Sequence, residues 1–415
     1  MHTQQKDRDF LINLTANLVD AVFFGMAIGF ASFVTIIPLF VSQLTDSAIL
    51  IGLVPAIHSL GWQLPQLFMA SPVARLSRYK PMVLRLTVHE RWPFLGLALI
   101  AWFLPQIDNR LALGLVFLML AIQGLGGGIT ANAWQSMVGK IFPSRWHGRF
   151  FGLQAGLANA IMALGALGAG FLLEALPFPQ NFAAIFAIAL FGLVLSYFAL
   201  FPVREAEVPP APELVERQAY RRNLLQIMRS DRGFRRFLLV RNLSQFAIMA
   251  VSFYSVYAVR QFEAPGAAIG LMTALMSGSS IFANALMGWA GDRWGHQVAL
   301  GIGTIAMFLS AVIAWLAPAY SWFYLAFILA GVASVAVWTT PIAMTLEFGG
   351  LSQRPAYLGL SHTLTAPSTL LAPILGGWLA DWLGYPAAFV AGAVASLVVL
   401  FFLPGLRIRQ ASSVS

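Results

Sequence analysis

The sequence predicts an all-α membrane protein in which twelve transmembrane helices form two pseudo-symmetric six-helix bundles. The 415 residues are 59% hydrophobic and only 10% charged, which is outside the range of soluble domains. Twelve apolar stretches are each long enough to cross a hydrocarbon core about 30 Å thick. Because lipid offers no partner to backbone polar groups, each stretch must pair its own backbone as a helix.

The twelve spans follow one another with short connections, except for one long connection in the middle of the chain. In chain order, we expect them at 12–41, 48–71, 82–105, 110–139, 149–175, 181–202, 237–261, 266–291, 298–317, 321–348, 356–383 and 386–404.

The positive charge lies almost entirely on one side of these spans. If the N-terminus is cytoplasmic, 22 of the 25 Lys and Arg residues lie at the cytoplasmic side. This count includes Arg85 and Arg241, which flank the cytoplasmic connections at the starts of spans three and seven. Only Arg110 and Arg260 lie at the outer side, and Arg91 alone lies deep inside a span. Cytoplasmic connections of membrane proteins carry the excess of Lys and Arg. We therefore expect a multi-pass protein of the cytoplasmic (inner) membrane with both termini inside the cell, and we attribute its net charge of +9 to topology rather than to nucleic-acid binding.

The long connection divides the chain into an N-terminal bundle (1–202), a cytoplasmic linker (203–236) and a C-terminal bundle (237–415). The linker begins with a Pro- and Glu-rich part that is typical of flexible segments. Its second part, 220–237, mixes apolar residues with arginines. This pattern predicts an amphipathic helix, either on the anionic membrane surface or as a solvated structural helix.

Short motifs recur in the two halves in the same order, which indicates a duplicated six-helix unit. Gly170-Phe-Leu-Leu-Glu174 at the end of span five is matched 207 positions later by Gly377-Trp-Leu-Ala-Asp381 in span eleven. Ile51-Gly52-Leu53 in span two is matched 218 positions later by Ile269-Gly270-Leu271 in span eight. Duplicated halves with a site at their interface are the plan of many transporters.

One loop carries a recognisable signature. Between spans eight and nine the chain reads Gly288-Trp-Ala-Gly-Asp292-Arg293-Trp-Gly295. This resembles the loop signature of the major facilitator superfamily, G-x-x-x-D-R-x-G. The equivalent loop of the first half, 70–80, keeps the basic residues but lacks the acid and both glycines. The resemblance covers the whole chain and implies the fold of that superfamily, with the subfamily unresolved.

In that family such loops cap a cytoplasmic gate, and the resemblance implies the same role here. By pseudo-symmetry we expect Asp292 close to Arg149, and Arg293 close to Glu347; a simple solvated turn is the alternative. The candidate gate residues are Arg75, Arg78, Arg149, Gly288, Asp292, Arg293, Gly295 and Glu347.

Charged side chains within the spans are expensive and need a partner or a wet cavity. Asp20 lies on one stripe of span one with Asn13 and Asn17. It is a candidate proton, cation or amine site, or else a structural acid. Glu90 and Arg91 in span three are further coupling candidates, for which we favour a packed ion-pair network over a relay.

Polar residues flanked by Trp on several spans suggest the wall of a cavity for an amphipathic organic solute. The family places spans one, four, seven and ten around its central cavity. Glycine-rich runs at 124–128 and 165–170 allow close helix contact. The candidate cavity residues are Asn17, Asp20, His58, Trp62, Gln123, Trp134, Asn242, Gln245, Trp338 and His362.

These features favour a secondary active transporter that moves a small organic solute by alternating access, with proton-coupled efflux as the candidate mode. The alternatives are uptake, uncoupled facilitation, or a transporter-like receptor or lipid-handling protein. We expect no enzyme, since no H-E-x-x-H or G-x-S-x-G motif occurs, and the absence of cysteine excludes Cys-based zinc sites. The expected partners are the solute, protons and membrane lipids, with no cofactor, no metal and no nucleic acid, and we expect a monomer.

Overall fold

The computed structural model describes residues 2–207, 217–345, 347–348 and 353–406, and all regular secondary structure within these ranges is helical. The first part of the chain forms α1 (His2–Phe30), α2 (Ile36–Ser42), α3 (Ala48–Ala74), α4 (Lys80–Leu86), α5 (Val88–Arg91), α6 (Pro93–Phe103), η1 (Leu104–Gln106), α7 (Asn109–Ile141), α8 (Ser144–Ala175) and α9 (Gln180–Ala199). The second part forms α10 (Arg217–Ser230), α11 (Arg232–Ile248), α12 (Val251–Phe262), α13 (Gly266–Trp294), α14 (His296–Leu316), α15 (Trp322–Trp338), α16 (Thr340–Thr345), α17 (Arg354–Leu383), α18 (Tyr385–Phe402) and η2 (Leu403–Gly405).

The predicted all-α membrane fold is confirmed. Within the described residues, ten helical stretches are long and apolar enough to cross a membrane. The two other predicted spans correspond to the α4–α6 series and to α17, both of which carry polar side chains in their middle turns.

Four of the predicted spans are not continuous helices, and proline accounts for three of the breaks. Proline has no N–H to donate, and its ring clashes with the carbonyl of the residue four positions earlier. Pro38, Pro93 and Pro341 each lie just after a break, at 31–35, Trp92 and Thr339 respectively. In the first break the Ser32 hydroxyl accepts hydrogen bonds from the backbone N–H groups of residues 34 and 35, both at 3.3 Å. Two further breaks, at Thr87 between α4 and α5 and at 249–250 between α11 and α12, contain no proline.

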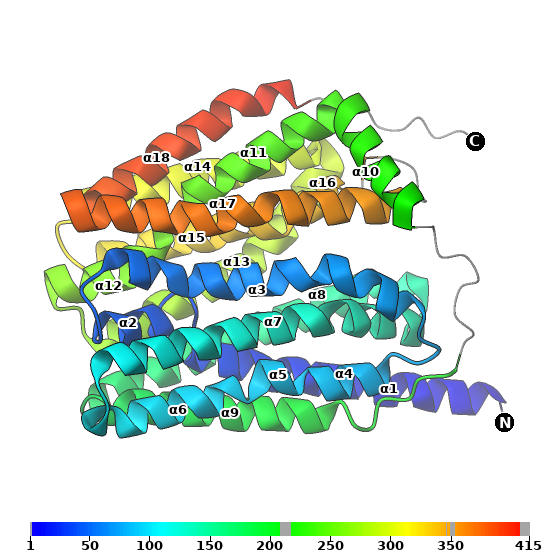
Figure 1. Cartoon of the computed structure of the whole chain (residues 1–415), viewed down its shortest axis with the longest axis horizontal. Coiled ribbons are helices and arrows are strands. Elements are labelled where there is room, and N and C mark those ends of the chain that lie inside the picture. The colour runs from blue at the N-terminus through cyan, green and yellow to red at the C-terminus, as the bar shows by residue number, and fades with distance from the viewer. Residues whose placement is uncertain (1, 208–216, 346, 349–352, 407–415) are drawn as a thin grey trace. The chain divides into compact units, whose positions relative to one another are not determined.

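The chain divides into two compact units. The first contains Met1–Thr45, Ile57–Pro212 and Pro265–Ser277, and the second contains Asp46–Ala56, Glu213–Ala264 and Gly278–Ser415. In the first unit α1 packs against α8 and α9, while α4, α5 and α6 follow one another beside α7 (Figure 1). In the second unit α14 packs against α15 and α18, and α11 packs against α17 and α18.

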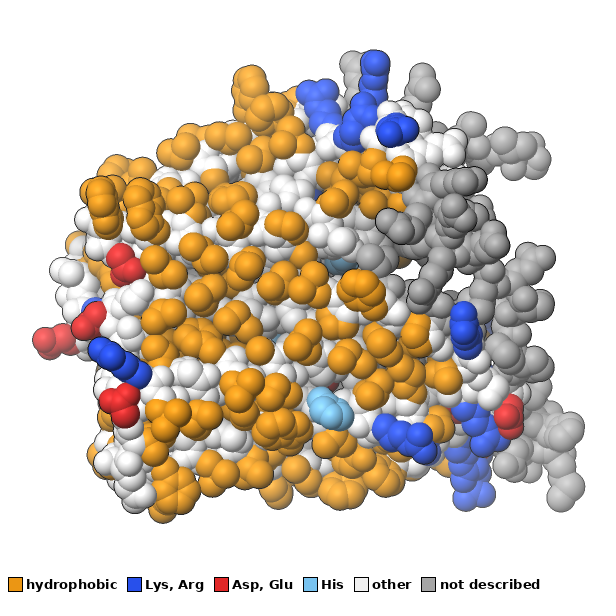
Figure 2. Space-filling view, viewed as in Figure 1, with side chains coloured by type: hydrophobic (Ala, Val, Ile, Leu, Met, Phe, Trp, Pro, Cys, Tyr) orange, Lys and Arg blue, Asp and Glu red, His pale blue; other side chains and the backbone are white. Residues whose placement is uncertain are grey.

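On the face shown in Figure 2, hydrophobic side chains cover most of the surface of the helices, as expected for helices in contact with lipid. Large exposed apolar side chains include Trp102 and Phe171 in the first unit and Phe282 and Phe401 in the second. Lys and Arg side chains gather near the helix ends in this view rather than along the middle of the helices.

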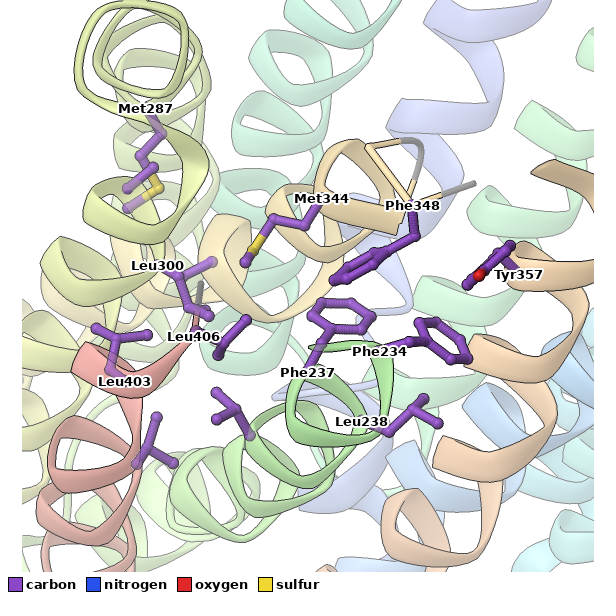
Figure 3. Close-up of a cluster of buried hydrophobic side chains, with 14 of the residues drawn as sticks. Phe234, Phe237, Leu238, Met287, Leu300, Met344, Phe348, Tyr357, Leu403 and Leu406 are labelled. Atoms are coloured by element: carbon purple, nitrogen blue, oxygen red, sulfur yellow. The ribbon is translucent and has the colours of Figure 1, made fainter. Parts of the chain in front are cut away.

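The predicted amphipathic helix corresponds to α10, which ends at Ser230 rather than at the expected position 237. The Asp231 side chain accepts a hydrogen bond from the backbone N–H of Phe234 at 2.8 Å, so it caps α11 and separates the two helices. Ile227 of α10 is buried in a hydrophobic cluster of the second unit, part of which is drawn in Figure 3. Leu225 lies off this face and is 60% exposed. One face of α10 therefore packs on protein.

Candidate functional site

A cavity of about 300 Å³ lies within the first unit. Residues from α1, α3, α4, α5, α7 and α8 and from the segments that follow α4 and α9 form its wall. They are Asp20, Ala21, Phe24, Trp62, Val83, Thr87, Glu90, Arg91, Gly127, Thr130, Ala131, Trp134, Gln135, Gln154, Ala155, Ala158 and Leu200. The volume is at the lower end of the range for small-molecule sites.

The Arg91 guanidinium group is the centre of a buried polar network on this wall. Its Nε donates to the backbone carbonyl of Leu193 on α9 at 3.2 Å. One terminal nitrogen donates to the carbonyl and hydroxyl oxygens of Thr87, and the other donates to the Ser196 hydroxyl at 2.9 Å. These partners hold the planar group in a single orientation. They also tie the α4–α6 series to α9.

Two carboxylates share this one guanidinium group. Asp20 Oδ1 on α1 lies 3.5 Å from Arg91 Nη2 and accepts a hydrogen bond from the Ser196 hydroxyl at 2.6 Å. Glu90 Oε2 lies 3.7 Å from Arg91 Nη1. The side chains of Asp20, Arg91 and Glu90 are only 10%, 7% and 15% exposed. With both acids ionised, the cluster carries one net negative charge in a largely buried place.

The glycines of α7 bring the neighbouring helices close enough to form this site. A Cβ atom on Gly126 would lie 2.5 Å from the backbone carbonyl carbon of His89, and one on Gly127 would lie 2.9 Å from Glu90 Oε1. On the other side of α7, a Cβ atom on Gly124 would lie 2.8 Å from the carbonyl oxygen of His58 on α3. The expectation that residues 124–128 allow close helix contact is therefore confirmed.

The rest of the wall is aromatic or uncharged. Trp62 and Trp134 supply aromatic rings, and Gln135 and Gln154 add uncharged polar groups. The Arg91 guanidinium carbon also lies 5.9 Å from the ring centre of Phe24, within the range of a cation–π contact. A site of this kind offers one charged spot within a mostly apolar surface.

The structure brings five of the predicted site residues together at this cavity, namely Asp20, Trp62, Glu90, Arg91 and Trp134. The favoured interpretation of Glu90 and Arg91 as a packed network agrees with the geometry, and Asp20 joins that network.

Three further predicted residues of the first unit lie nearby but do not belong to the cavity wall. His58 Nδ1 lies 2.7 Å from Gln123 Oε1, and Phe33 stacks on the His58 ring with 3.8 Å between ring centres. Asn17 is fully buried and donates to the carbonyl of Asn13 at 2.9 Å, while its own Oδ1 has no hydrogen-bond partner within the described part of the chain.

In the second unit, the predicted cavity residues of α11 bond to α17. Asn242 Oδ1 accepts from the Ser368 hydroxyl at 2.6 Å, and Gln245 Oε1 accepts from the Thr369 hydroxyl at 3.4 Å. Trp338 packs against a small apolar cluster around Met307. The two hydrogen bonds hold α11 against α17.

Arg241 differs from its expected place at the edge of the cytoplasmic connection. It is only 3% exposed, donates to the Ser361 hydroxyl, and its Nη2 lies 3.4 Å from Nδ1 of the predicted cavity residue His362. Its Nε has no hydrogen-bond partner among the described residues. The sequence placed it at a loop because it lies close to the start of its span, whereas packing of α11 on α17 buries it.

The predicted gate residues of the first unit lie at helix ends. Arg78 forms an ion pair with Glu207 at 3.3 Å, and the Arg149 guanidinium lies 5.5 Å from the ring centre of Trp146. Arg75 is exposed. Asp292 belongs to the second unit and Arg149 to the first, so their proximity stays a prediction.

In the second unit, Glu347 pairs with His296 at 2.5 Å, and Arg293 instead lies 6.0 Å from the ring centre of Trp289. Gly295 has φ +90°, a conformation that glycine adopts readily, and it ends the turn between α13 and α14. Gly288 faces open space, and Asp292 is exposed.

The sequence missed Glu205, which attaches the start of the linker to the first unit. Its side chain is 1% exposed and accepts hydrogen bonds from the backbone N–H groups of Tyr79 and Lys80 and from Lys140 Nζ, at 2.8 to 2.9 Å. Partial burial lowers the pKa of the Lys80 ammonium group from its usual value, and the nearby Glu205 carboxylate opposes that shift. A Pro- and Glu-rich composition contained no signal for this contact.

Comparison with known proteins identifies the family. The sequence model of the Major Facilitator Superfamily matches residues 90–259 and 237–413. The chain belongs to the Major Facilitator Superfamily. Its structure is also similar to solved transporters. Against a mutant form of the nucleoside transporter NupG the TM-score is 0.73 with 12% sequence identity, covering 96% of this chain and 99% of that chain. Against a D-xylose-proton symporter the TM-score is 0.67 with 15% identity, covering 97% and 98%. At this level of identity the likeness concerns the fold.

Curated relatives match only part of the chain. The MFS-type transporter ppzB of Metarhizium majus is 29% identical over 142 residues, 34% of this chain and 31% of that protein. The probable vesicular acetylcholine transporter-B of Danio rerio is 32% identical over 130 residues, 31% of this chain and 26% of that protein. The matched segments thus span about a third or less of these relatives. Family membership and the apolar helices together make this chain a multi-pass membrane protein of the Major Facilitator Superfamily.

Proposed function

We propose that this protein is a secondary active transporter that exports a small organic cation across the cytoplasmic membrane in exchange for protons. Transport proceeds by alternating access of the two bundles, with both termini in the cytoplasm. The observation that carries the proposal is the buried cluster of two carboxylates and one guanidinium group on the wall of an aromatic cavity.

The charge balance of the cluster suits an exchange of cation for proton. An uncompensated charge at membrane depth is costly, so the one net negative charge of Asp20, Glu90 and Arg91 favours a bound cation. A proton on one carboxylate satisfies this demand, and so does a cationic solute in the cavity. Because the proton and the cationic solute neutralise the same negative charge, they compete for the cluster. Such competition couples export of the solute to entry of the proton.

The walls of the cavity favour an organic cation over a small inorganic ion. Trp62 and Trp134 supply apolar area together with the negative ring faces that attract cations. Acetylcholine, named for the Danio rerio relative, is itself an organic cation. The excess of Lys and Arg in alternate connections supports cytoplasmic termini.

Transport in proteoliposomes tests the proposal, with ethidium and tetraphenylphosphonium as probe cations. We expect an imposed pH gradient to drive uptake of a probe against its concentration gradient in the wild-type protein. Asp20→Asn should abolish the dependence on the pH gradient while exchange of labelled for unlabelled probe continues. The matched control is Glu263→Gln, a change at an exposed acid that is not part of the cavity wall. Gradient-driven transport that persists unchanged in Asp20→Asn would exclude Asp20 from coupling.

A further inference from the structure

Two surface pockets lie on neighbouring sides of α1 and share no residue with the cavity around Arg91. The larger, of about 1060 Å³, is enclosed by α1, the start of α4, the end of α7 and the segment 203–206 that follows α9. The smaller, of about 390 Å³, is enclosed by α1 and the end of α9. All of these elements belong to the first unit. We call the larger one the basic pocket and the smaller one the apolar groove.

The basic pocket carries an excess of positive charge. Among the described residues of its wall, two acids, Asp9 and Glu205, stand against four cations. The cations are Arg78, Lys80, Lys140 and Arg204. Glu207, which is not part of the wall, pairs with Arg78 at 3.3 Å. Even when this third acid is included, one of the four positive charges has no counter-charge at the pocket.

The Lys80 ammonium group is the cation without an acidic partner. Its Nζ donates to the backbone carbonyl oxygens of Phe201 and Val203 at 2.6 and 2.8 Å, and no carboxylate of the described residues forms an ion pair with it. The other three cations each form an ion pair with an acid, at 3.3, 2.9 and 2.6 Å. An ammonium group has three N–H donors, so the two carbonyl bonds leave Lys80 with one donor for an anion.

Two guanidinium groups of the pocket are accessible as well. The side chains of Arg78 and Arg204 are 53% and 43% exposed, and each ion pair is formed by one terminal nitrogen. A guanidinium group has five N–H donors in a planar fork that matches the oxygens of a phosphate. Ion pairs at exposed positions contribute little to stability. These two arginines can therefore bind a phosphate without losing a strong interaction.

The apolar groove has a wall of hydrocarbon apart from one hydroxyl group. Thr15 supplies the hydroxyl, and the other described residues of the wall are Leu11, Ile12, Ala16, Val19, Ala199 and Pro202. The side chains of Leu11 and Val19 are 60% and 37% exposed. They belong to a stretch of α1 that is long and apolar enough to cross a membrane. A groove of this composition on a membrane-spanning helix fits a hydrocarbon chain.

The two sites meet where the linker is attached to α1. Ile12 of the groove directly precedes Asn13 of the basic pocket on α1. After α9, Pro202 of the groove directly precedes Val203 of the pocket. At this border the Asn13 side chain donates to the backbone carbonyl of Arg204 at 2.9 Å and accepts from its backbone N–H at 2.7 Å. A cationic pocket thus adjoins a hydrocarbon groove, as a phosphate adjoins the acyl chains in a phospholipid.

We propose that the two sites together bind one anionic phospholipid, with its phosphate in the basic pocket and an acyl chain in the apolar groove. The single uncompensated positive charge matches the single negative charge of a phosphodiester. A soluble phosphate compound would leave the groove unused, which favours a lipid. Anionic lipids give the cytoplasmic leaflet its negative charge. The inference therefore rests on the cytoplasmic placement of these helix ends in the proposed function, and it is independent of the solute and of proton coupling.

Native mass spectrometry of the purified protein in detergent tests this site, at constant pH and without solute. The probes are palmitoyl-oleoyl phosphatidylglycerol, the matched phosphatidylcholine, and glycerophosphoglycerol, which is the same anionic headgroup without acyl chains. We expect one phosphatidylglycerol molecule to bind more tightly than phosphatidylcholine, by about fivefold or more, because only its headgroup carries a net charge. Glycerophosphoglycerol at the same concentration should not bind.

Substitutions separate the pocket from the groove. Arg78→Gln and Arg204→Gln should each weaken phosphatidylglycerol binding about fivefold, the effect of one basic residue near an anionic lipid. Arg85→Gln, at an exposed arginine of α4 outside the pocket wall, is the matched control and should leave binding unchanged.

The groove is tested without any change of charge. Thr15→Trp fills it and should weaken phosphatidylglycerol binding by about fivefold or more, because the acyl chain loses its apolar contact. Leu118→Trp, at an exposed position of α7 outside the groove, is the control and should leave binding unchanged. All the substituted positions are exposed, so the variants should fold.

Each alternative has its own result. Absence of a phosphatidylglycerol-bound species would refute the site. Equal affinity for the two lipids, or a loss in Arg85→Gln as large as in Arg78→Gln, would show general attraction to the surface and would refute the pocket. Binding that is unchanged in Thr15→Trp, or glycerophosphoglycerol that binds as tightly as the lipid, would refute a lipid and indicate a soluble phosphate compound. A failure of proton-driven transport would leave these binding results intact.

Discussion

Replacement of Arg91 by Met tests the buried charge cluster most directly. The Met side chain keeps much of the apolar volume but removes every hydrogen bond that the guanidinium group donates. The carboxylates of Asp20 and Glu90 then remain buried, with the Ser196 hydroxyl still donating to Asp20. Removing one partner of a buried ion pair costs about 3–5 kcal/mol, because a charge is left uncompensated. We expect Arg91→Met to lower the free energy of unfolding by that amount.

A double-mutant cycle separates the ion pair from simple loss of packing. Asp20→Asn alone keeps an acceptor for Ser196 and leaves Arg91 paired with Glu90, so it should cost about 1 kcal/mol. In the combined variant one of the stranded carboxylates is absent. The loss in free energy of unfolding of the double variant should therefore be smaller, by at least about 1 kcal/mol, than the sum of the losses of the two single variants.

Reversible unfolding in mixed detergent micelles measures these differences. Arg85→Met is the matched control, because Arg85 is exposed on α4 in the same helix series, and it should change stability by less than about 0.5 kcal/mol. If the losses in free energy of unfolding of Asp20→Asn and Arg91→Met add to within about 0.5 kcal/mol in the double variant, the coupling of Asp20 to Arg91 is refuted. An Arg91→Met variant as stable as the control would refute the network as a structural element.

The remaining predictions concern packing, the linker and the gate. Gly126→Ala should lower the free energy of unfolding by about 2 kcal/mol or more, because the new methyl group meets the backbone of α5. Gly139→Ala on the same helix is the control. Its methyl group faces open space, so it should be neutral or slightly stabilising in the same unfolding assay. Glu205→Gln should free the start of the linker, seen as faster proteolytic cleavage between the bundles; an unchanged cleavage rate would contradict the attachment. Asp292→Asn and Arg293→Ala should lower the transport rate more than solute affinity, and normal rates in both would count against the gate.

Much of the secondary structure could be predicted from the sequence, because hydropathy and proline act locally. Each predicted span proved helical, and Pro38, Pro93 and Pro341 lie where three of the spans break. The breaks themselves were missed, since an apolar run of roughly 20 to 30 residues shows the same hydropathy whether its helix is continuous or interrupted.

The candidate site was predictable in its members but not in its connections. Asp20, Glu90 and Arg91 stood out because charge is rare within membrane spans. Their meeting point depends on Ser196 and Leu193 of α9, two residues that look like ordinary apolar-helix positions in the sequence. Arg241 is another residue whose surroundings the sequence did not reveal. Its position suggested the edge of a loop, whereas helix packing buries it.

Composition and charge distribution were sufficient to establish that this chain crosses a membrane many times, since the energy of moving a segment into lipid is a property of that segment alone. The identity of the groups that neutralise its buried charges is a different matter. It depends on which faces of α1, α5, α7 and α9 meet, and contacts between distant parts of the chain choose those faces. Asp20 meets Arg91 across 71 positions and Ser196 across 176. Such contacts exist only after the helices have packed.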